Sequence, residues 1–418
     1  MKKILLPFIL IAVIVAACEP LPTTPQFVTQ IPFYASQTPE FIIPVTDTPI
    51  VSEPFTETPA FIVPVTETPT PEFIIPVPET PTPVPLAGWW EVYFTDPLAI
   101  NNPDAFAGSI EEKLIQWINA AQVSIHIASF EFNLTPVAEA LIAAKNRGVD
   151  VKWITDDEYG LKIDSEPERR QFSLLMGAGI EVKDDAGREA FMHNKFWIFD
   201  QQAVWTGSTN ITVNGIFKQN NNVIVLRSPE IAYIYEREFQ ELWSGQFGPR
   251  APSTISNQWA ILDTTPVQVL FSSEDNAMSS LLAVVNDAKF SIRFLAFSFT
   301  DDALAQTMIE RFKAGVDVQG VYETLASTSI YSDLKTFWCA GVPVRQDGNG
   351  SLMHNKVIIV DNSTVITGSL NFTAGANEKN EENVIIIDNP EIAALYLQEY
   401  AKIWSLAHDV EAGTFTCQ

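Results

Sequence analysis

Basic residues are scarce in this sequence. Its 418 residues include 25 Lys and Arg against 51 Asp and Glu, which gives a formal charge of −26 at pH 7. Residues 88–418 alone carry 43 acidic and 23 basic side chains, a formal charge of −20. A field of this sign repels polyanions, so the composition disfavours a protein that follows a nucleic-acid backbone.

Cysteine and histidine are also sparse. The three cysteines, Cys18, Cys339 and Cys417, are too few for a disulfide framework. Cys339 and Cys417 could pair in an exported protein, but the sequence does not place their Cα atoms within the ~7 Å that a disulfide needs. The four histidines form no Cys/His cluster and no HExxH pattern. We therefore expect no metal ion and no cofactor.

The N-terminus carries a short apolar run, residues 4–17, which follows Lys2 and Lys3. The run falls short of the ~20 residues that a membrane-spanning helix needs. It ends in Val15-Ala16-Ala17-Cys18, which resembles a bacterial lipobox. Residues 1–18 are therefore predicted to be a lipoprotein signal peptide that ends at Cys18, the lipid anchor of an exported protein at the extracytoplasmic face of the cell membrane. The alternative is ordinary secretion, in which Cys18 is discarded.

Residues 19–87 lack Lys and Arg and are rich in Pro and Thr. A short pattern of Phe, Ile or Val, Pro and Val recurs at residues 41–45, 61–65 and 73–77. Proline removes backbone donors and favours extended polyproline II structure, so no globular core is expected here. The segment is predicted to be a disordered or semi-rigid stalk, although its Phe and Ile content leaves a partner-binding role open.

From residue 88 onward, short apolar runs alternate with amphipathic stretches, as in an α/β domain. The same order occurs twice: helix, strand, helix and strand over about 110–154, and again from the helix before Asp287 to about residue 321. Matching letters support the repeat, since residues 229–232 and 390–393 both read Pro-Glu-Ile-Ala. Two homologous α/β domains are therefore predicted, over residues 88–250 and 251–418.

Polar motifs stand at corresponding points of the two halves. The first half contains His193, Lys195 and Asp200, followed by Ser208 and Asn210. The second repeats this spacing with His354, Lys356, Asp361, Ser369 and Asn371. Four apolar residues separate Lys from Asp in each half, which indicates a buried strand. Side chains two apart on a strand point the same way, so each histidine is expected beside a lysine.

These residues resemble the paired HxKxxxxD and GSxN motifs of the phospholipase D superfamily, over about residues 89–418. The resemblance implies two phospholipase D-like α/β sandwich domains in one chain, with mixed sheets flanked by helices, and metal-independent catalysis. It implies a monomeric catalytic unit with one active site. The predicted catalytic residues are His193, Lys195, Asp200, His354, Lys356, Asp361 and Glu382, and the predicted substrate-binding residues are Ser208, Asn210, Ser369 and Asn371.

Phosphodiester cleavage needs a nucleophile, a proton donor and charge stabilisation on the phosphoryl oxygens. One imidazole would attack to give a phosphohistidine, and the other would protonate the leaving alkoxide and then deprotonate water. The lysines, the asparagine amides and the Ser208 and Ser369 hydroxyls would surround the phosphate.

The halves differ 28 residues after each histidine, where Asn221 corresponds to Glu382. If each residue serves the histidine of its own half, Glu382 raises the pKa of His354 and Asn221 orients His193. That interpretation makes His193 the nucleophile and His354 the general acid, with the reverse assignment still open. Two polar residues facing solvent are the alternative.

Hydrolysis or head-group exchange on phospholipids is the first functional hypothesis, with a phospholipid and the membrane as partners. Cardiolipin synthase-like transfer comes second. Nucleic-acid cleavage comes third because of the negative charge, and a non-enzymatic lipid-binding lipoprotein is the distant option. Three features are assigned no catalytic role: His126, His408, and the acidic run Asp156-Asp157-Glu158. The acidic run is interpreted as a solvated loop, with cation binding as the less favoured alternative.

Overall fold

The computed structural model describes residues 88–166, 169–249, 258–411 and 413–417, and these belong to one compact unit. The predicted signal peptide, the anchor Cys18 and the linker 19–87 lie outside the described residues. No helix in the described part of the chain is both long enough and apolar enough for a bilayer crossing.

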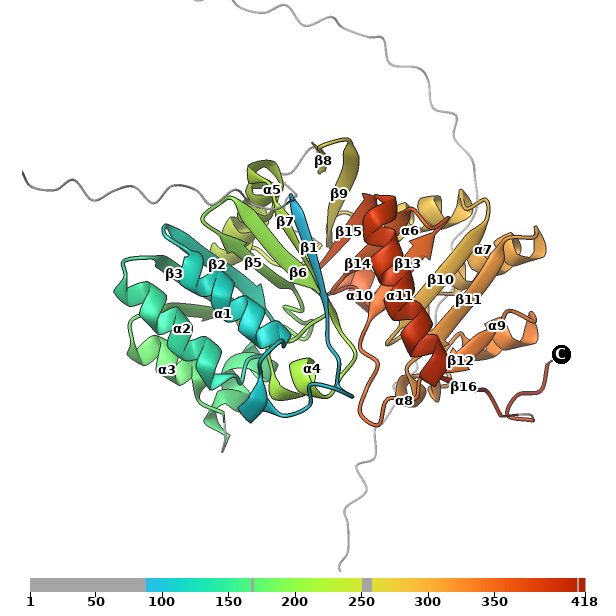
Figure 1. Ribbon diagram of the computed structural model, residues 1–418, viewed down its shortest axis with the longest axis horizontal. Helices are drawn as coiled ribbons and strands as arrows, with labels where there is room; N and C mark the ends of the chain where they lie inside the picture. Colours follow the sequence, from blue (N-terminus) through green and yellow to red (C-terminus); the bar gives the residue numbers. More distant parts are fainter. Residues whose placement is uncertain (1–87, 167–168, 250–257, 412, 418) are drawn as a thin grey trace, which may run out of the picture. The chain divides into compact units, whose positions relative to one another are not determined.

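The first half is built on a seven-stranded mixed sheet, in the order β1-β7-β6-β5-β2-β3-β4 (Figure 1). Strands β2, β3 and β4 are parallel, and the other pairs are antiparallel. The strands are β1 (Trp90–Phe94), β2 (Ser124–Ser129), β3 (Asp150–Thr155), β4 (Glu181–Asp184), β5 (Lys195–Phe199), β6 (Ala203–Gly207) and β7 (Asn222–Arg227). The helices are η1 (Pro103–Ala105), α1 (Ile110–Ala120), α2 (Thr135–Asn146), η2 (Asp157–Lys162), η3 (Ile163–Ser165), α3 (Gln171–Gly177), α4 (Val213–Phe217) and α5 (Pro229–Trp243).

The second half repeats this plan on a nine-stranded sheet, in the order β16-β12-β11-β10-β13-β14-β15-β9-β8. Its strands are β8 (Trp259–Leu262), β9 (Thr265–Ser272), β10 (Ser291–Ala296), β11 (Asp317–Tyr322), β12 (Val344–Gln346), β13 (Lys356–Val360), β14 (Thr364–Gly368), β15 (Glu382–Asp388) and β16 (His408–Asp409). Its helices are α6 (Ala277–Asn286), α7 (Asp302–Lys313), α8 (Thr324–Ser327), α9 (Leu334–Cys339), α10 (Ala374–Glu378) and α11 (Pro390–Leu406). The predicted repeat and α/β class are therefore confirmed.

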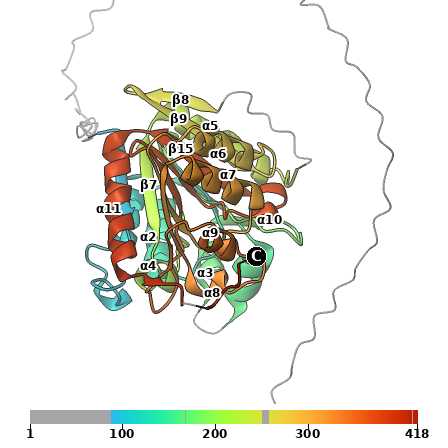
Figure 2. The same ribbon diagram turned by 90° about the vertical axis from the view of Figure 1, so that its right-hand side faces the viewer.

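The motif strands β5 and β13 are buried on both faces, as their apolar runs predict. Phe196 and Ile198 point into a core shared by the two halves, whereas Trp197 and Phe199 point into a core formed by the first half alone. This alternation follows from the two-residue period of a strand. In Figures 1 and 2, α1, α2 and α3 cover the outer side of one sheet, and α6, α7 and α9 cover that of the other.

The shared core is closed by α5 and α11, which begin at the repeated Pro-Glu-Ile-Ala sequence. Ser228 caps α5 by accepting a hydrogen bond from the backbone N–H of Ile231, and Asn389 caps α11 in the same way. Proline occupies the first turn of both helices, where its missing N–H costs no hydrogen bond. The two helices therefore start at equivalent places and direct equivalent faces to the core.

The C-terminal segment is joined to α9 by a disulfide between Cys339 and Cys417, whose Cα atoms lie 5.5 Å apart. The sequence left this pairing open. The bond closes a loop of 78 residues in sequence separation, so it constrains the unfolded chain substantially.

Candidate active site

The two motif histidines stand immediately before β5 and β13. Each is held by backbone contacts from the opposite half of the chain. The His193 N–H donates to the Glu381 carbonyl at 2.9 Å, and the His354 N–H donates to the Asn220 carbonyl at 2.9 Å. Isolated parallel bridges join Met192 to Glu381 and Asn220 to Met353. The structure thus brings both histidines to one site and fixes each with backbone that precedes a strand of the other half.

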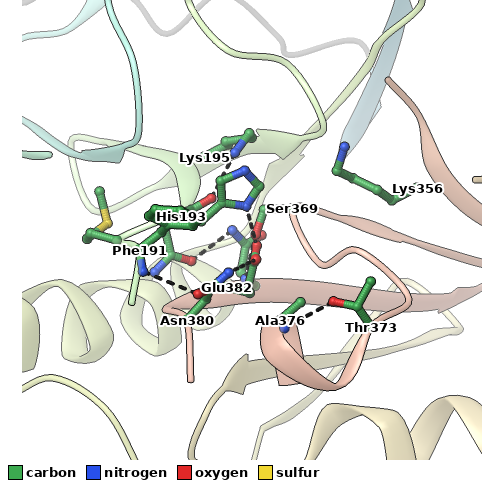
Figure 3. Close-up of polar contacts among 12 residues, drawn as sticks. Phe191, His193, Lys195, Lys356, Ser369, Thr373, Ala376, Asn380 and Glu382 are labelled. Atoms are coloured by element: carbon green, nitrogen blue, oxygen red, sulfur yellow. Dashed lines mark hydrogen bonds and ion pairs between the residues drawn. The ribbon is translucent and has the colours of Figure 1, made fainter. Parts of the chain in front are cut away.

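The side-chain partners of the histidines are crossed between the halves. His193 Nδ1 donates to Glu382 Oε2 at 2.7 Å (Figure 3), and His354 Nδ1 donates to Asn221 Oδ1 at 3.0 Å. The prediction that Glu382 serves His354 and Asn221 serves His193 is therefore wrong. The backbone bridges give the reason, because they place the start of β15 beside His193 and the start of β7 beside His354.

The structure also corrects the roles of Ser208 and Ser369, which do not line the cavity between the histidines. Both are fully buried. Ser208 Oγ donates to Asn221 Oδ1 at 2.8 Å, and the Ser369 hydroxyl bonds the Glu382 carboxylate. Their hydroxyls are thus engaged in orienting the two histidine partners, and they are positioning residues rather than phosphate donors.

An asparagine network that the sequence analysis missed lies behind the histidines. Asn383 Nδ2 donates to Asn194 Oδ1 at 3.0 Å, and Asn222 Nδ2 donates to Asn355 Oδ1 at 2.7 Å. All four side chains are completely buried, and each bond crosses between the halves. The signal was present in the sequence, since an asparagine follows each motif histidine and another stands immediately after Asn221 and Glu382.

The motif lysines are buried beside their histidines. Lys195 Nζ donates to the His193 carbonyl at 2.9 Å, and Lys356 Nζ donates to the His354 carbonyl at 2.8 Å. Burial lowers the pKa of Lys195 to about 8, although the nearby Glu382 carboxylate opposes this shift. Burial and the positive charge of Lys195 hold the pKa of Lys356 well below its ordinary range. An anionic ligand would favour the charged form of both.

Burial and the adjacent lysines also hold the pKa values of both histidines well below their usual range. Burial raises the pKa of Glu382 to about 7, against the lowering effect of Lys195. In each ring Nδ1–H is engaged by a partner, which leaves Nε2 for chemistry. A neutral imidazole held in this way can act as a nucleophile or as a proton acceptor.

A cavity of about 1100 Å³ opens over both histidines. Asn210 and Asn371 line it, and their Oδ1 atoms have no hydrogen-bond partner among the described residues. Phe130 and Phe297 form its symmetric walls, in edge contact with His193 and His354 at ring-centroid distances of 4.8 and 4.7 Å. An amide Oδ1 only accepts hydrogen bonds, so the two asparagines would contact a bound phosphate through their Nδ2–H groups.

Asp200 and Asp361, predicted to be catalytic, lie at the opposite ends of their strands. Four residues separate each from its motif lysine, and the five residue steps along the strand span about 16 Å. The Asp200 carboxylate accepts hydrogen bonds from three backbone N–H groups, those of residues 122, 123 and 124. Asp361 does the same for residues 289, 290 and 291. Both aspartates fix the start of a neighbouring strand and take no part in the cavity.

We expect Asp361→Asn to lower the free energy of unfolding by about 1–2 kcal/mol, because charge-assisted hydrogen bonds are lost at a partly exposed site. The kcat of the folded variant should stay within severalfold of the parent value. Burial raises the Asp361 pKa, but the bonds from Ser291, Phe290 and Lys289 lower it more, so the net pKa lies below 3.8. The stabilisation is therefore present at neutral pH and is lost as pH falls through that lowered value.

Urea unfolding at pH 7 and at about pH 3 would measure this effect, with the difference between variant and parent shrinking in acid. A large loss of kcat with unchanged stability would contradict the structural role of Asp361.

His126 lies outside the cavity, as expected of a residue whose counterpart in the second half, Arg293, is not a histidine. It is buried, and its ring bonds Glu236 at 2.9 Å and Asp150 at 3.3 Å. His408 lies in the exposed strand β16.

Comparison with known proteins places this site in context. A family model described as a cardiolipin synthase, PLD-like domain matches residues 114–243 and 281–404. Mitochondrial cardiolipin hydrolase of Xenopus tropicalis is 34% identical over 130 residues, which cover 31% of this chain and 62% of that protein. Phospholipase D of Rickettsia bellii is 32% identical over 139 residues, which cover 33% of this chain and 69% of that protein.

Among solved structures, the phosphatidylserine synthase of Haemophilus influenzae superposes with a TM-score of 0.59 at 12% identity. The superposition covers 78% of this chain and 88% of that one. A likeness at this identity concerns the fold, and it extends over both halves.

Proposed function

The chain belongs to the phospholipase D superfamily, and from this premise we propose that it hydrolyses phospholipids through a phosphohistidine on His193. One observation carries the proposal. Two imidazoles from different halves line a single cavity, each with Nδ1 engaged and with a buried lysine beside it. The named relatives, a phospholipase D and a cardiolipin hydrolase, favour a lipid phosphodiester as the substrate.

In the first step Nε2 of His193 attacks phosphorus and forms a P–N bond while the bond to the leaving alcohol breaks. The attack leaves a positive charge on the phosphorylated ring. Glu382, bonded to Nδ1, stabilises that charge, whereas the amide partner of His354 offers no such stabilisation. His193 therefore remains our nucleophile, for a reason different from the one that the sequence suggested.

His354 serves as the proton donor to the leaving oxygen. Burial and the lysine charges disfavour its protonation in the free protein, and the negative charge of a bound phosphodiester offsets the lysines. After the alcohol leaves, neutral His354 accepts a proton from water, which attacks phosphorus and displaces His193. Lys195, Lys356 and the two cavity amides stabilise the phosphoryl oxygens throughout.

Transfer to an alcohol, as in a cardiolipin synthase-like reaction, uses the same groups and differs only in the acceptor. Nucleic acid is the weaker substrate hypothesis. The cavity wall mixes Glu131, Glu189 and Glu378 with Arg188 and Lys379, which is not the continuous basic track that a polyanion needs. This local charge balance agrees with the formal charge of the whole chain.

The test is to incubate the full-length chain with phosphatidylcholine, phosphatidylglycerol, cardiolipin and an oligonucleotide, and to identify the products. Release of phosphatidic acid, from cardiolipin together with phosphatidylglycerol, is expected. In the presence of an added alcohol, formation of the corresponding phosphatidyl alcohol would show transfer. Exclusive cleavage of the oligonucleotide would replace the lipid assignment, and absence of any product would favour a binding protein.

We also propose that the protein is exported and held at the membrane by a lipid on Cys18. The support is the short apolar run ending in Ala16-Ala17-Cys18. Cys18→Ala is expected to leave an unprocessed precursor or to release the protein from membranes. Unchanged processing and retention of the variant would refute the anchor.

A further inference from the structure

Three aspartates meet at the carboxyl ends of the parallel strands β3 and β4. Asp156 and Asp157 follow β3, and Asp185 follows β4. One carboxylate oxygen from each lies within 4.8 Å of the other two. Ligands bound to one Ca²⁺ at 2.3–2.6 Å lie no more than about 5 Å apart, so these oxygens fit around a single ion.

Asp185 has one carboxylate oxygen that is not satisfied by the described residues. Its side chain is 1% exposed, and it lies with its carboxylate toward the other two aspartates. Its Oδ1 accepts from the Asp157 N–H at 3.0 Å, whereas its Oδ2 is buried without a hydrogen-bond partner among the described residues. Burying an unpaired carboxylate oxygen is costly, and native structures normally satisfy such atoms.

The surroundings make this carboxylate harder to explain without a cation. Within the described part of the chain, no Lys, Arg or His side chain forms an ion pair with the three aspartates. Lys195 interacts electrostatically with Asp156. Lys162, which is exposed, interacts electrostatically with Asp157. Three mutually repelling carboxylates therefore meet without a direct ion pair.

The second half of the chain offers an internal comparison. Strand registers align Asp156, Asp157 and Asp185 with Glu323, Thr324 and Asp347. Asp347 is satisfied, because its Oδ1 accepts from the Asn349 N–H at 3.0 Å and its Oδ2 from the Thr324 N–H at 3.2 Å.

At these equivalent positions the first half has Asp157 in place of Thr324, and it leaves Oδ2 of Asp185 without a partner among the described residues. The two halves have the same fold around these positions and differ in the side chains that they carry there. This difference indicates a feature of the first half, not a general requirement of the fold.

We propose that Asp156, Asp157 and Asp185 bind a divalent cation, and that Ca²⁺ is the ion that fits best. Three carboxylates offer the hard oxygen ligands that Ca²⁺ prefers, and Ca²⁺ tolerates an irregular coordination shell completed by water. The site does not depend on the proposed lipid activity, since it rests on the proximity of the three carboxylates and on the unpartnered oxygen of Asp185.

The cation would stiffen one wall of the cavity without entering the phosphoryl chemistry. Asp156 Oδ1 accepts from the Tyr159 N–H at 2.8 Å, and its Oδ2 accepts from the Met192 N–H at 3.2 Å. Tyr159 lines the cavity, and Met192 directly precedes His193. An ion on Asp156 therefore fixes the loop that carries Tyr159 against the segment that carries the nucleophile.

Calorimetric titration of the metal-free, full-length chain with Ca²⁺ tests the proposal. We expect one Ca²⁺ per chain and an increased Tm in its presence, because a ligand that binds only the folded state stabilises it. Asp185→Asn is expected to weaken binding by roughly tenfold or more, since one charged ligand is lost. Asp157→Thr, which installs the residue found at the equivalent position 324, should weaken it similarly while preserving the fold.

Asp347→Asn is the matched control in the second half and is expected to leave Ca²⁺ affinity unchanged. Absence of binding up to about 10 mM Ca²⁺, well above the affinities of weak calcium modules, would overturn the site. Binding that persists unchanged in both Asp185→Asn and Asp157→Thr would overturn it equally. Because the readout is ion binding and Tm, the outcome does not depend on which phosphodiester the protein cleaves.

Discussion

His354→Ala protein is expected to accumulate a phosphoryl adduct on His193, and His193→Ala protein is expected to form no adduct. Loss of the nucleophile should lower turnover roughly 10⁴- to 10⁶-fold. Loss of the general acid and base should lower it roughly 10²- to 10⁴-fold. The adduct persists in His354→Ala because no group remains to deprotonate the attacking water.

The physical basis is the difference between the two histidine partners. A phosphorylated imidazole that retains Nδ1–H is cationic, and only His193 has a carboxylate to stabilise that charge. Denaturation in alkali followed by mass spectrometry would preserve and locate the acid-sensitive P–N bond. An adduct found on His354 in His193→Ala protein would reverse the assignment.

Glu382→Gln is expected to slow formation of the His193 adduct roughly 10²- to 10⁴-fold, as loss of a carboxylate that orients and stabilises a catalytic histidine does. The decisive measurement is made in the His354→Ala background. Because Glu382 contacts His193, its effect on adduct formation should persist when His354 is absent. If Glu382 acted through His354, the substitution would have no further effect there.

The same pair predicts a pH dependence. Burial raises the pKa of Glu382 to about 7, and only the ionised carboxylate stabilises a cationic ring. Adduct formation should therefore slow as pH falls below about 7, with an apparent pKa that belongs to the coupled pair. This decrease in the rate of adduct formation at low pH, the acidic limb of the pH profile, should disappear in Glu382→Gln. Asn221→Ala is the matched control, because it removes the His354 partner and should leave the limb in place.

Local sequence patterns determined much of this protein. Apolar runs of four residues between Lys and Asp predict buried strands, and β5 and β13 occur there. The repeated spacing predicts equivalent sites in two halves, because the same local pattern forms the same strand twice. The distance between Lys195 and Asp200 was also available, since five residue steps along an extended chain span about 16 Å. The prediction that Lys195 and Asp200 are both catalytic did not take this distance into account.

Only the tertiary structure decided how the halves meet. Periodicity shows which side of a strand a residue occupies, but it does not show which strand of the other half comes to lie beside it. The starts of β7 and β15 each lie against the histidine of the opposite half, so Glu382 serves His193. The pairing of Cys339 with Cys417 and the convergence of Asp185 on Asp156 and Asp157 have the same origin. In each case the partners are distant in sequence, and their contact arises from the packing of whole strands and helices.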